Sequence, residues 1–221
     1  GTAAATPADL SGLRSLDGEF ALRAGSFNYQ QYRVRDARLD ATLEAGMLRV
    51  TSLQGMAWGG QFDARAIADA RASRVAVDGV ARGIDVKALL ADVAGKDWIE
   101  GTGNVTVDLE AAGRTVQEMQ SRLAGRAALD VKDGAIRGIN LAKRLREAKA
   151  MLTSRRDESH AAVQTEKTDF SELHVSFNVA EGVARSNDLD VKSPFLRIGG
   201  AGTTDIGRGR VDYLVRTTVT D

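Results

Sequence analysis

The histidines are the first residues of this chain to consider for chemistry, because imidazole serves as a metal ligand and as a general base. Either role needs partner side chains that converge on one point. His160 stands in a charged segment, and His174 lies on the polar side of an alternating stretch. Neither has partners at the spacing of a metal site or a catalytic triad. We therefore expect both histidines to be solvated.

Pairs of carboxylates are the second possibility, since paired acids can perform general acid–base catalysis. Asp36 and Asp40 form one pair, and Asp188 and Asp190 form another. In each pair the two positions differ by an even number, which in a regular strand places both side chains on one face. The pattern is typical of a solvated strand face.

A glycine-rich run at 199–202 resembles a phosphate-binding loop only superficially. Such a loop needs a following helix and a Lys-Ser/Thr pair, and this run has neither. Because it lies within a strand pattern, it predicts a kink or a close approach of two backbones. The sequence therefore predicts a protein that is not an enzyme and holds no cofactor and no metal.

Composition narrows the class of protein. Thirty basic residues balance thirty acidic ones, so the chain lacks the strong positive field that nucleic-acid binding needs. It has no cysteine, which excludes disulfides and thiolate metal sites. No apolar run approaches the roughly 18 residues that span a bilayer. Residues 1–14 are expected to be a linker or a disordered end.

Alternating hydrophobicity dominates the rest of the chain and predicts strands. In 101–112, Val105, Val107 and Leu109 share one parity, while Thr106 and Asp108 share the other. Further strands are predicted at 47–58, 61–68, 73–82, 121–132, 170–181, 183–192 and 210–220, and near 32–43 with a bulge at Asp36. Short glycine turns join them, so consecutive strands must be antiparallel neighbours.

Two or three short helices complete the prediction, at 85–93, 115–120 and 140–153. The third carries Leu141 and Leu145 at helical spacing. Its remaining surface holds Lys143, Arg144, Arg146 and Lys149, which could contact anionic lipid headgroups. An ordinary amphipathic helix with solvated charges explains the same pattern.

The predicted fold is mainly β: a long curved antiparallel sheet that forms a groove or an incomplete barrel. Residues 15–98 form the N-terminal strand-rich part and 99–221 the C-terminal part of the same domain. The helices are too few to cover the apolar face of so many strands. That face must either close on itself as a core or stay open to something apolar, and periodicity alone does not distinguish the two.

The stretch from Ile99 to Val219 resembles the C-terminal region of the AsmA family. An ordered set of short motifs carries the resemblance: GTGNVTVDL at 101–109, GRTV at 113–116, DGAIRGINL at 133–141, KTDFSEL at 167–173, GVARSNDL at 182–189 and KSPFLRI at 192–198. The part before residue 94 resembles the family more loosely.

The resemblance implies a periplasmic protein of the Gram-negative envelope, related to TamB and to bridge-like lipid transfer proteins. It implies an anchor in the inner membrane through a segment outside this chain. The implied function is phospholipid transfer between the inner and outer membranes, in support of outer-membrane biogenesis. The implied partners are phospholipid acyl chains and other envelope proteins, with no nucleic acid.

The candidate groove residues are apolar positions of the alternating strands. They are Val105, Val107, Leu109, Leu173, Val175, Phe177, Val211 and Tyr213. The alternative is a structural module that influences outer-membrane protein assembly without binding lipid, through strands added to its exposed sheet edges.

Overall fold

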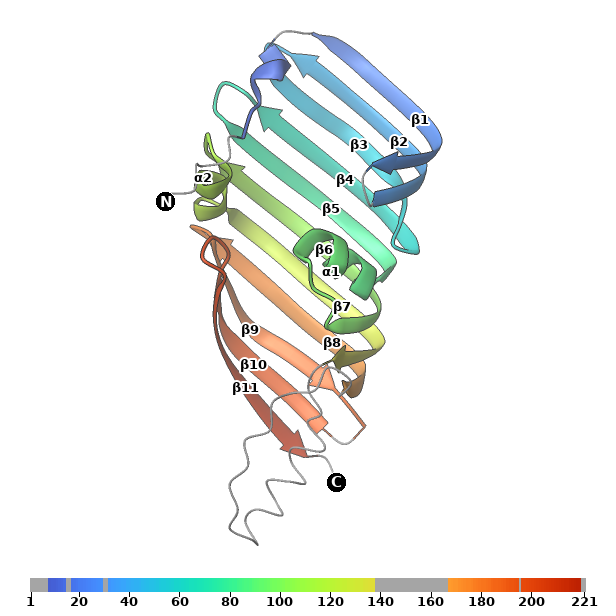
Figure 1. The fold of residues 1–221 in the computed structure, drawn as a ribbon, viewed down its shortest axis with the longest axis vertical. Helices are drawn as coiled ribbons and strands as arrows, with labels where there is room; N and C mark the ends of the chain where they lie inside the picture. The colour runs from blue at the N-terminus through green and yellow to red at the C-terminus, as the bar shows by residue number, and fades with distance from the viewer. Residues whose placement is uncertain (1–7, 15–16, 30–31, 138–166, 195, 220–221) are drawn as a thin grey trace, which may run out of the picture.

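The structure is a single antiparallel sheet of eleven strands in sequence order. It was obtained as a computed structural model, which describes residues 8–14, 17–29, 32–137, 167–194 and 196–219. Each strand pairs with the next along the chain, from β1 at one edge to β11 at the other. Figure 1 shows the strands following one another along a sheet that twists and curves over its length.

The predicted alternation locates nine of the eleven strands, all except β1 and β10, and all the strands are long. They are β1 (Gly18–Tyr29), β2 (Tyr32–Glu44), β3 (Met47–Ala57), β4 (Gly60–Asp69), β5 (Arg74–Asp85), β6 (Ile99–Ala112), β7 (Ala124–Arg137), β8 (Lys167–Ala180), β9 (Val183–Lys192), β10 (Leu196–Asp205) and β11 (Arg210–Val219). β1 and β11 lie at opposite ends of the strand order, so the sheet is not closed into a barrel. The mainly β, antiparallel and open fold is confirmed.

Two of the predicted irregularities are present. Asp36 has a positive φ of 49°, and the register of β2 against β3 shifts between Arg35 and Arg38. In β10 the register against β9 shifts between Gly200 and Gly202. A side chain at Gly202 would lie 2.3 Å from the backbone oxygen of Asp212, so the neighbouring strand approaches closely there. The run at 199–202 is therefore a packing feature of the sheet.

The described helices are short and lie outside the sheet. They are the 3-10 helix η1 (Ser11–Arg14), α1 (Val86–Ala94) and α2 (Val116–Ser121). Asp85 caps α1 by accepting a hydrogen bond from the Ala88 N–H, and Gly95 ends it in the left-handed conformation. The predicted helix at 140–153, with its four basic residues, lies outside the described residues.

Strand pairing joins the two parts expected at 15–98 and 99–221 of the same domain. β5 and β6 form one ladder that runs from the pairing of Arg74 with Ala112 to the pairing of Asp85 with Thr102. Part of the expected N-terminal linker also contacts the loops that follow β4 and β6. The Arg14 guanidinium donates to the Ala70 carbonyl at 2.7 Å, and the Ala8 N–H donates to the Arg114 carbonyl at 3.0 Å.

Strand register assigns the apolar side chains to one face. Residues directly opposite each other in an antiparallel pair share a face. Val77 lies opposite Leu109, Val107 opposite Ala127, and Leu129 opposite Val175. The alternate positions, such as Asp78 opposite Asp108, form the polar face. The two-faced sheet expected from the alternation is confirmed across its central strands.

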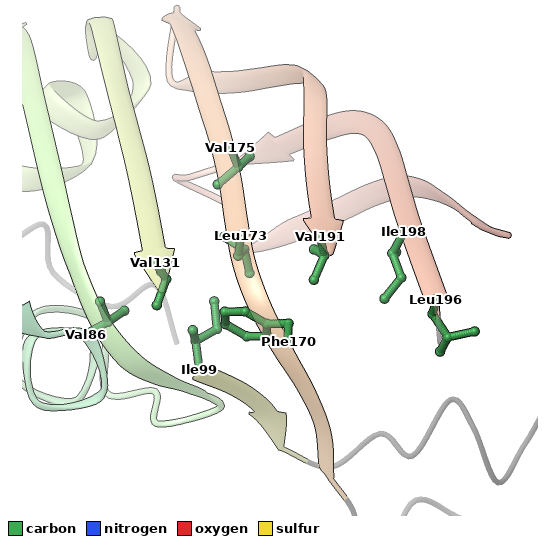
Figure 2. Packing of buried hydrophobic residues seen from close by; sticks show 9 residues of the cluster. All are labelled: Val86, Ile99, Val131, Phe170, Leu173, Val175, Val191, Leu196 and Ile198. Carbon is green, nitrogen blue, oxygen red and sulfur yellow. The ribbon is translucent and has the colours of Figure 1, made fainter. Parts of the chain in front are cut away.

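The most buried part of the apolar face lies where one end of β6, β7, β8, β9 and β10 converges. The cluster there consists of Val86, Ile99, Val131, Phe170, Leu173, Val175, Val191, Leu196 and Ile198 (Figure 2). Val86, at the start of α1, and Val191 have no exposed surface. α1 therefore closes part of this end by placing its first residue against the sheet.

Candidate functional site

The eight residues proposed from the sequence as groove positions share the apolar face. Val105, Val107 and Leu109 lie on β6, and Leu173, Val175 and Phe177 lie on β8. Val211 and Tyr213 lie on edge strand β11, opposite Thr204 and Gly202 of β10. The structure thus places residues more than 100 positions apart in sequence on one face of the same sheet.

Burial separates these eight residues into three groups. Leu173 and Val175 are 3% and 7% exposed and belong to the core cluster. The three β6 residues, Phe177 and Tyr213 are half-buried, whereas Val211 is 67% exposed. Only the half-buried and exposed members offer surface to another molecule.

Both edge strands expose further apolar side chains on this face. On β1, Phe20 and Leu22 are 46% and 50% exposed, and they lie opposite Ala41 and Leu39 of β2. On β11, Val215 and Val219 are 50% and 60% exposed. β1 was not among the strands predicted from the sequence, although the alternation of Phe20, Leu22 and Ala24 could have revealed it.

A cavity of about 550 Å³ lies on the apolar face beside α1. Leu89, Leu90 and Val93 of α1 form one wall. The sheet supplies the other wall from β2 to β6, including the small residues Ala64 and Ala81. In Figure 1, α1 lies across the sheet in front of β6. The helix therefore roofs part of the apolar face without filling the space beneath it.

The polar face is also hollowed, with a depression of about 760 Å³. It is crossed by ion pairs between neighbouring strands: Arg65 lies 3.1 Å from Asp78, and Arg126 lies 3.5 Å from Asp108. These side chains are more than 45% exposed, so each pair contributes little to stability. Both faces of the sheet are therefore hollowed, and they differ in their side chains: one face is apolar and the other carries ion pairs.

His174 belongs to a polar network around an irregular stretch of β9. Its Nδ1 lies 2.6 Å from Asp130 Oδ1, and its Nε2 lies 3.5 Å from Asp188 Oδ2. The hydrogen bond with Asp130 is the main cause that raises the pKa of His174. The side chain is 46% exposed, as expected for a solvated histidine, but the expectation did not include these carboxylate partners.

Asp188 joins this network to the opposite face. It accepts hydrogen bonds from the Ser176 backbone N–H, the Ser176 hydroxyl and the Ser186 hydroxyl, and Ser186 in turn accepts one from Tyr213. Burial of Asp188 raises its pKa, but the hydrogen bonds from Ser176 and Ser186 outweigh burial and hold the pKa below its ordinary value. The network ties β7, β8, β9 and β11 together where the β8–β9 register shifts.

The raised pKa of His174 gives a pH prediction. A raised pKa stabilises the fold below the ordinary pKa of about 6.5, and this stabilisation is lost as the pH rises through the folded-state value. The free energy of unfolding should therefore fall between about pH 6 and pH 8, and His174→Gln should remove that component. Urea denaturation of both proteins at each pH measures it.

The lowered pKa of Asp188 acts in a different pH range. Its stabilisation is present above the ordinary aspartate pKa of about 3.9 and is lost only as the pH falls below that value. It is therefore constant between pH 6 and pH 8. Equal pH dependence in the original protein and in His174→Gln would contradict the role assigned to the histidine.

Two kinds of site are absent from the described part of the chain. Among the residues that the structure describes, no group of three or more His, Asp or Glu side chains could hold a metal ion. None of the described helices is long and apolar enough to cross a membrane.

Comparison with known protein families matches the AsmA family over residues 3–189. The chain belongs to the AsmA family. The match includes the N-terminal strands, where the sequence motifs resemble the family only loosely, and it ends before the last two strands. No curated protein and no solved structure matches the chain.

Membership of the AsmA family implies association with the cell envelope and a role in outer-membrane biogenesis or assembly. The family is not known as an enzyme family. The apolar face of the sheet is therefore the candidate site of this AsmA-family chain.

Proposed function

We propose that this chain forms part of a periplasmic hydrophobic path along which phospholipids pass between the inner and outer membranes. The observation that carries the proposal is an open sheet whose apolar face continues through the central strands and is exposed on both edge strands. In this proposal the protein is non-enzymatic, and an inner-membrane anchor outside this chain holds it in place.

Hydrocarbon burial supplies the driving force for such a path. Removing each methylene of an acyl chain from water contributes about 0.8 kcal/mol, and this requires no specific polar partner. On β5, β6, β7 and β8, the side chains between Val75 and Val179 that face the apolar side of the sheet are uncharged. A surface of this kind binds tails of different lengths and lets them shift along it.

The polar face is a poor surface for the same molecule. Its depression holds Arg65, Asp78, Asp108 and Arg126, which lie in ion pairs exposed to water. Covering these charges with hydrocarbon would remove their hydration without replacing it. The proposal therefore assigns acyl chains to one face of the sheet. Headgroup contact by Lys143, Arg144, Arg146 and Lys149 stays a prediction.

One observation favours the alternative, a module that assists outer-membrane protein assembly without holding lipid. β11 is an edge strand of ten residues, and among the described strands it pairs only with β10. Such an edge can pair with a strand of another protein. In that case Val211, Val215 and Val219 would pack against apolar side chains of the added strand.

Native mass spectrometry of the chain purified from a Gram-negative host tests the proposal. We expect phospholipid to remain bound to the original protein. Val215→Asp should lower lipid occupancy at least about tenfold, because a carboxylate in contact with hydrocarbon costs on the order of 2.5 kcal/mol.

Leu214→Asp is the matched control. Leu214 neighbours Val215 on the same strand, is 61% exposed against 50%, and points to the polar face. Both changes should leave the fold intact, since both side chains are largely exposed. Absence of phospholipid from the folded original protein would reject the lipid path and favour the interaction module. Equal loss in both variants would contradict the assignment to the apolar face.

A further inference from the structure

The bulge at Asp36 decides on which face of the sheet the first side chains of β2 lie. Without a bulge, the period-two alternation of the later apolar residues of β2 would continue and place Arg33 and Arg35 on the apolar face. Instead Val34 lies on that face: a Cβ at Gly55, on the apolar side of β3, would lie 2.8 Å from the Val34 Cγ1. Arg33 and Arg35 therefore lie on the polar face.

Arg38, which lies beyond the bulge, joins Arg35 on the polar face. The two arginines lie opposite Gln54 and Met56, which are two positions apart on β3 and therefore share a face. Arg38 also lies directly opposite Arg23 of the edge strand β1. Like charges in that arrangement destabilise a strand pair, so a bound anion would relieve the repulsion.

These side chains form a basic cluster on the polar side of β1 and β2, and all of them are exposed. The cluster consists of Arg23, Arg33, Arg35 and Arg38. In the part of the chain that the structure describes, no carboxylate lies within ion-pair distance of any of them, that of Asp36 included. In the central strands, by contrast, Arg65 and Arg126 are each paired with an aspartate. The positive charge of the basic cluster is therefore not neutralised by its neighbours.

A hollow of about 490 Å³ opens on the polar face at this cluster, within the size range of ligand pockets. Arg33, Arg35 and Ser26 supply its polar lining, and the half-buried Met56 and Trp58 supply apolar surface. No aspartate or glutamate of the described residues lines it. Guanidinium groups only donate hydrogen bonds, and a serine hydroxyl can donate as well. The hollow therefore fits an anion joined to a less polar group.

Arg33 and Arg35 are placed to hold one anion together. They are two positions apart on a strand, which separates their Cα atoms by about 6.6 Å and lets both long side chains reach a common point. Each guanidinium binds two oxygens of an acid group through paired hydrogen bonds. A carboxylate has two oxygens and occupies one guanidinium, whereas a phosphate group has enough oxygens for both. The pair therefore favours phosphate over carboxylate.

We propose that the hollow at Arg33 and Arg35 binds the phosphate group of a phosphorylated ligand, which Arg23 and Arg38 attract through their charge. The part of the ligand next to the phosphate lies against Met56. The site is on the polar face, across the sheet from the surface proposed for acyl chains, and it does not rest on the lipid path. Soluble phosphates and lipid headgroups share this chemistry, and the test separates them.

Two probes test the site on the purified chain. Isothermal titration calorimetry with inorganic pyrophosphate measures binding of a soluble ligand. Co-sedimentation with phosphatidylcholine vesicles that contain phosphatidic acid measures binding of a headgroup, with phosphatidylcholine vesicles alone as the blank. We expect binding to at least one probe, and Arg35→Gln should weaken it about tenfold because a bidentate, charge-assisted contact is lost. Arg35→Lys keeps the charge but not the paired hydrogen bonds, so it should restore only part of the affinity.

Arg49→Gln is the matched control. Arg49 is exposed on the polar face of β3, opposite Thr42, and does not line the hollow. Its replacement removes the same charge and should leave binding unchanged. Arg33→Gln repeats the test at the other guanidinium, should Arg35→Gln not fold.

The outcomes separate the possibilities. Binding only to pyrophosphate assigns a soluble ligand, binding only to the phosphatidic acid vesicles assigns a headgroup, and binding to both shows that the phosphate itself is recognised. No binding of either probe by the folded original protein would overturn the site. So would equal weakening by Arg35→Gln and Arg49→Gln, which would show a general effect of charge. Because the site and the apolar face are separate, Arg35→Gln should not change the phospholipid occupancy measured by native mass spectrometry.

Discussion

Replacing Phe170 with alanine should lower the free energy of unfolding by about 3–5 kcal/mol, the range for removing a buried aromatic side chain. Phe170 is 3% exposed and lies in the cluster where five strands converge. Its ring also lies against Gly134, at a position where any side chain would clash with it. Urea denaturation at a fixed pH measures the change.

The size of this effect follows from the architecture. A single sheet has no second layer to close over a void, so the cluster at this end supplies much of its fixed packing. Phe20→Ala is the control, since Phe20 lies on the same face at edge strand β1 and is 46% exposed. Its loss should cost much less. Equal costs would show that the cluster is not what holds the curved sheet together.

A valine at Gly125 should lower the free energy of unfolding by about 2–6 kcal/mol, the sum of backbone strain and overpacking. Gly125 has a φ of 131°, which a β-branched residue does not readily adopt. A Cβ there would lie 2.0 Å from the Asp108 carbonyl oxygen. Both effects act on the β6–β7 ladder, so the variant should also lose cooperativity in denaturation.

Gly199→Val is the matched control for that variant. Gly199 also lies inside a strand, but its φ is not in the left-handed region, and a Cβ there would meet only the Leu189 oxygen at 3.6 Å. Valine favours strands, so we expect this change to be neutral or slightly stabilising. Similar losses at both positions would show that glycine is needed for reasons other than local geometry.

These two stability predictions also bear on the proposed lipid path. The buried cluster and the close β6–β7 approach at Gly125 hold the sheet together, whereas in the proposed function the exposed apolar residues of β1 and β11 offer surface to lipid. Changes at Val175, which is 7% exposed, would therefore test folding more than lipid binding. Val215 and Leu214 separate the two, because neither is needed for the core.

The sequence by itself determined nine of the eleven strands, their antiparallel order and their two faces. Residues such as Val105, Val107 and Leu109 alternate with period two, and short glycine turns leave no room for a crossover. Local geometry encodes these features, so they can be predicted without knowing the fold. The bulge at Asp36 and the cap at Asp85 were accessible for the same reason.

Only the tertiary structure decided whether the apolar face is open. Leu173 and Val211 carry the same alternation in sequence, yet one is buried in the cluster and the other is 67% exposed. The difference depends on whether β1 and β11 meet and on where α1 lies, and both follow from the summed twist and curvature of eleven strands. The same applies to His174, whose partners Asp130 and Asp188 come from neighbouring strands. Period-two patterning specifies which side a residue faces, but the coverage of that side is set by contacts distant in sequence.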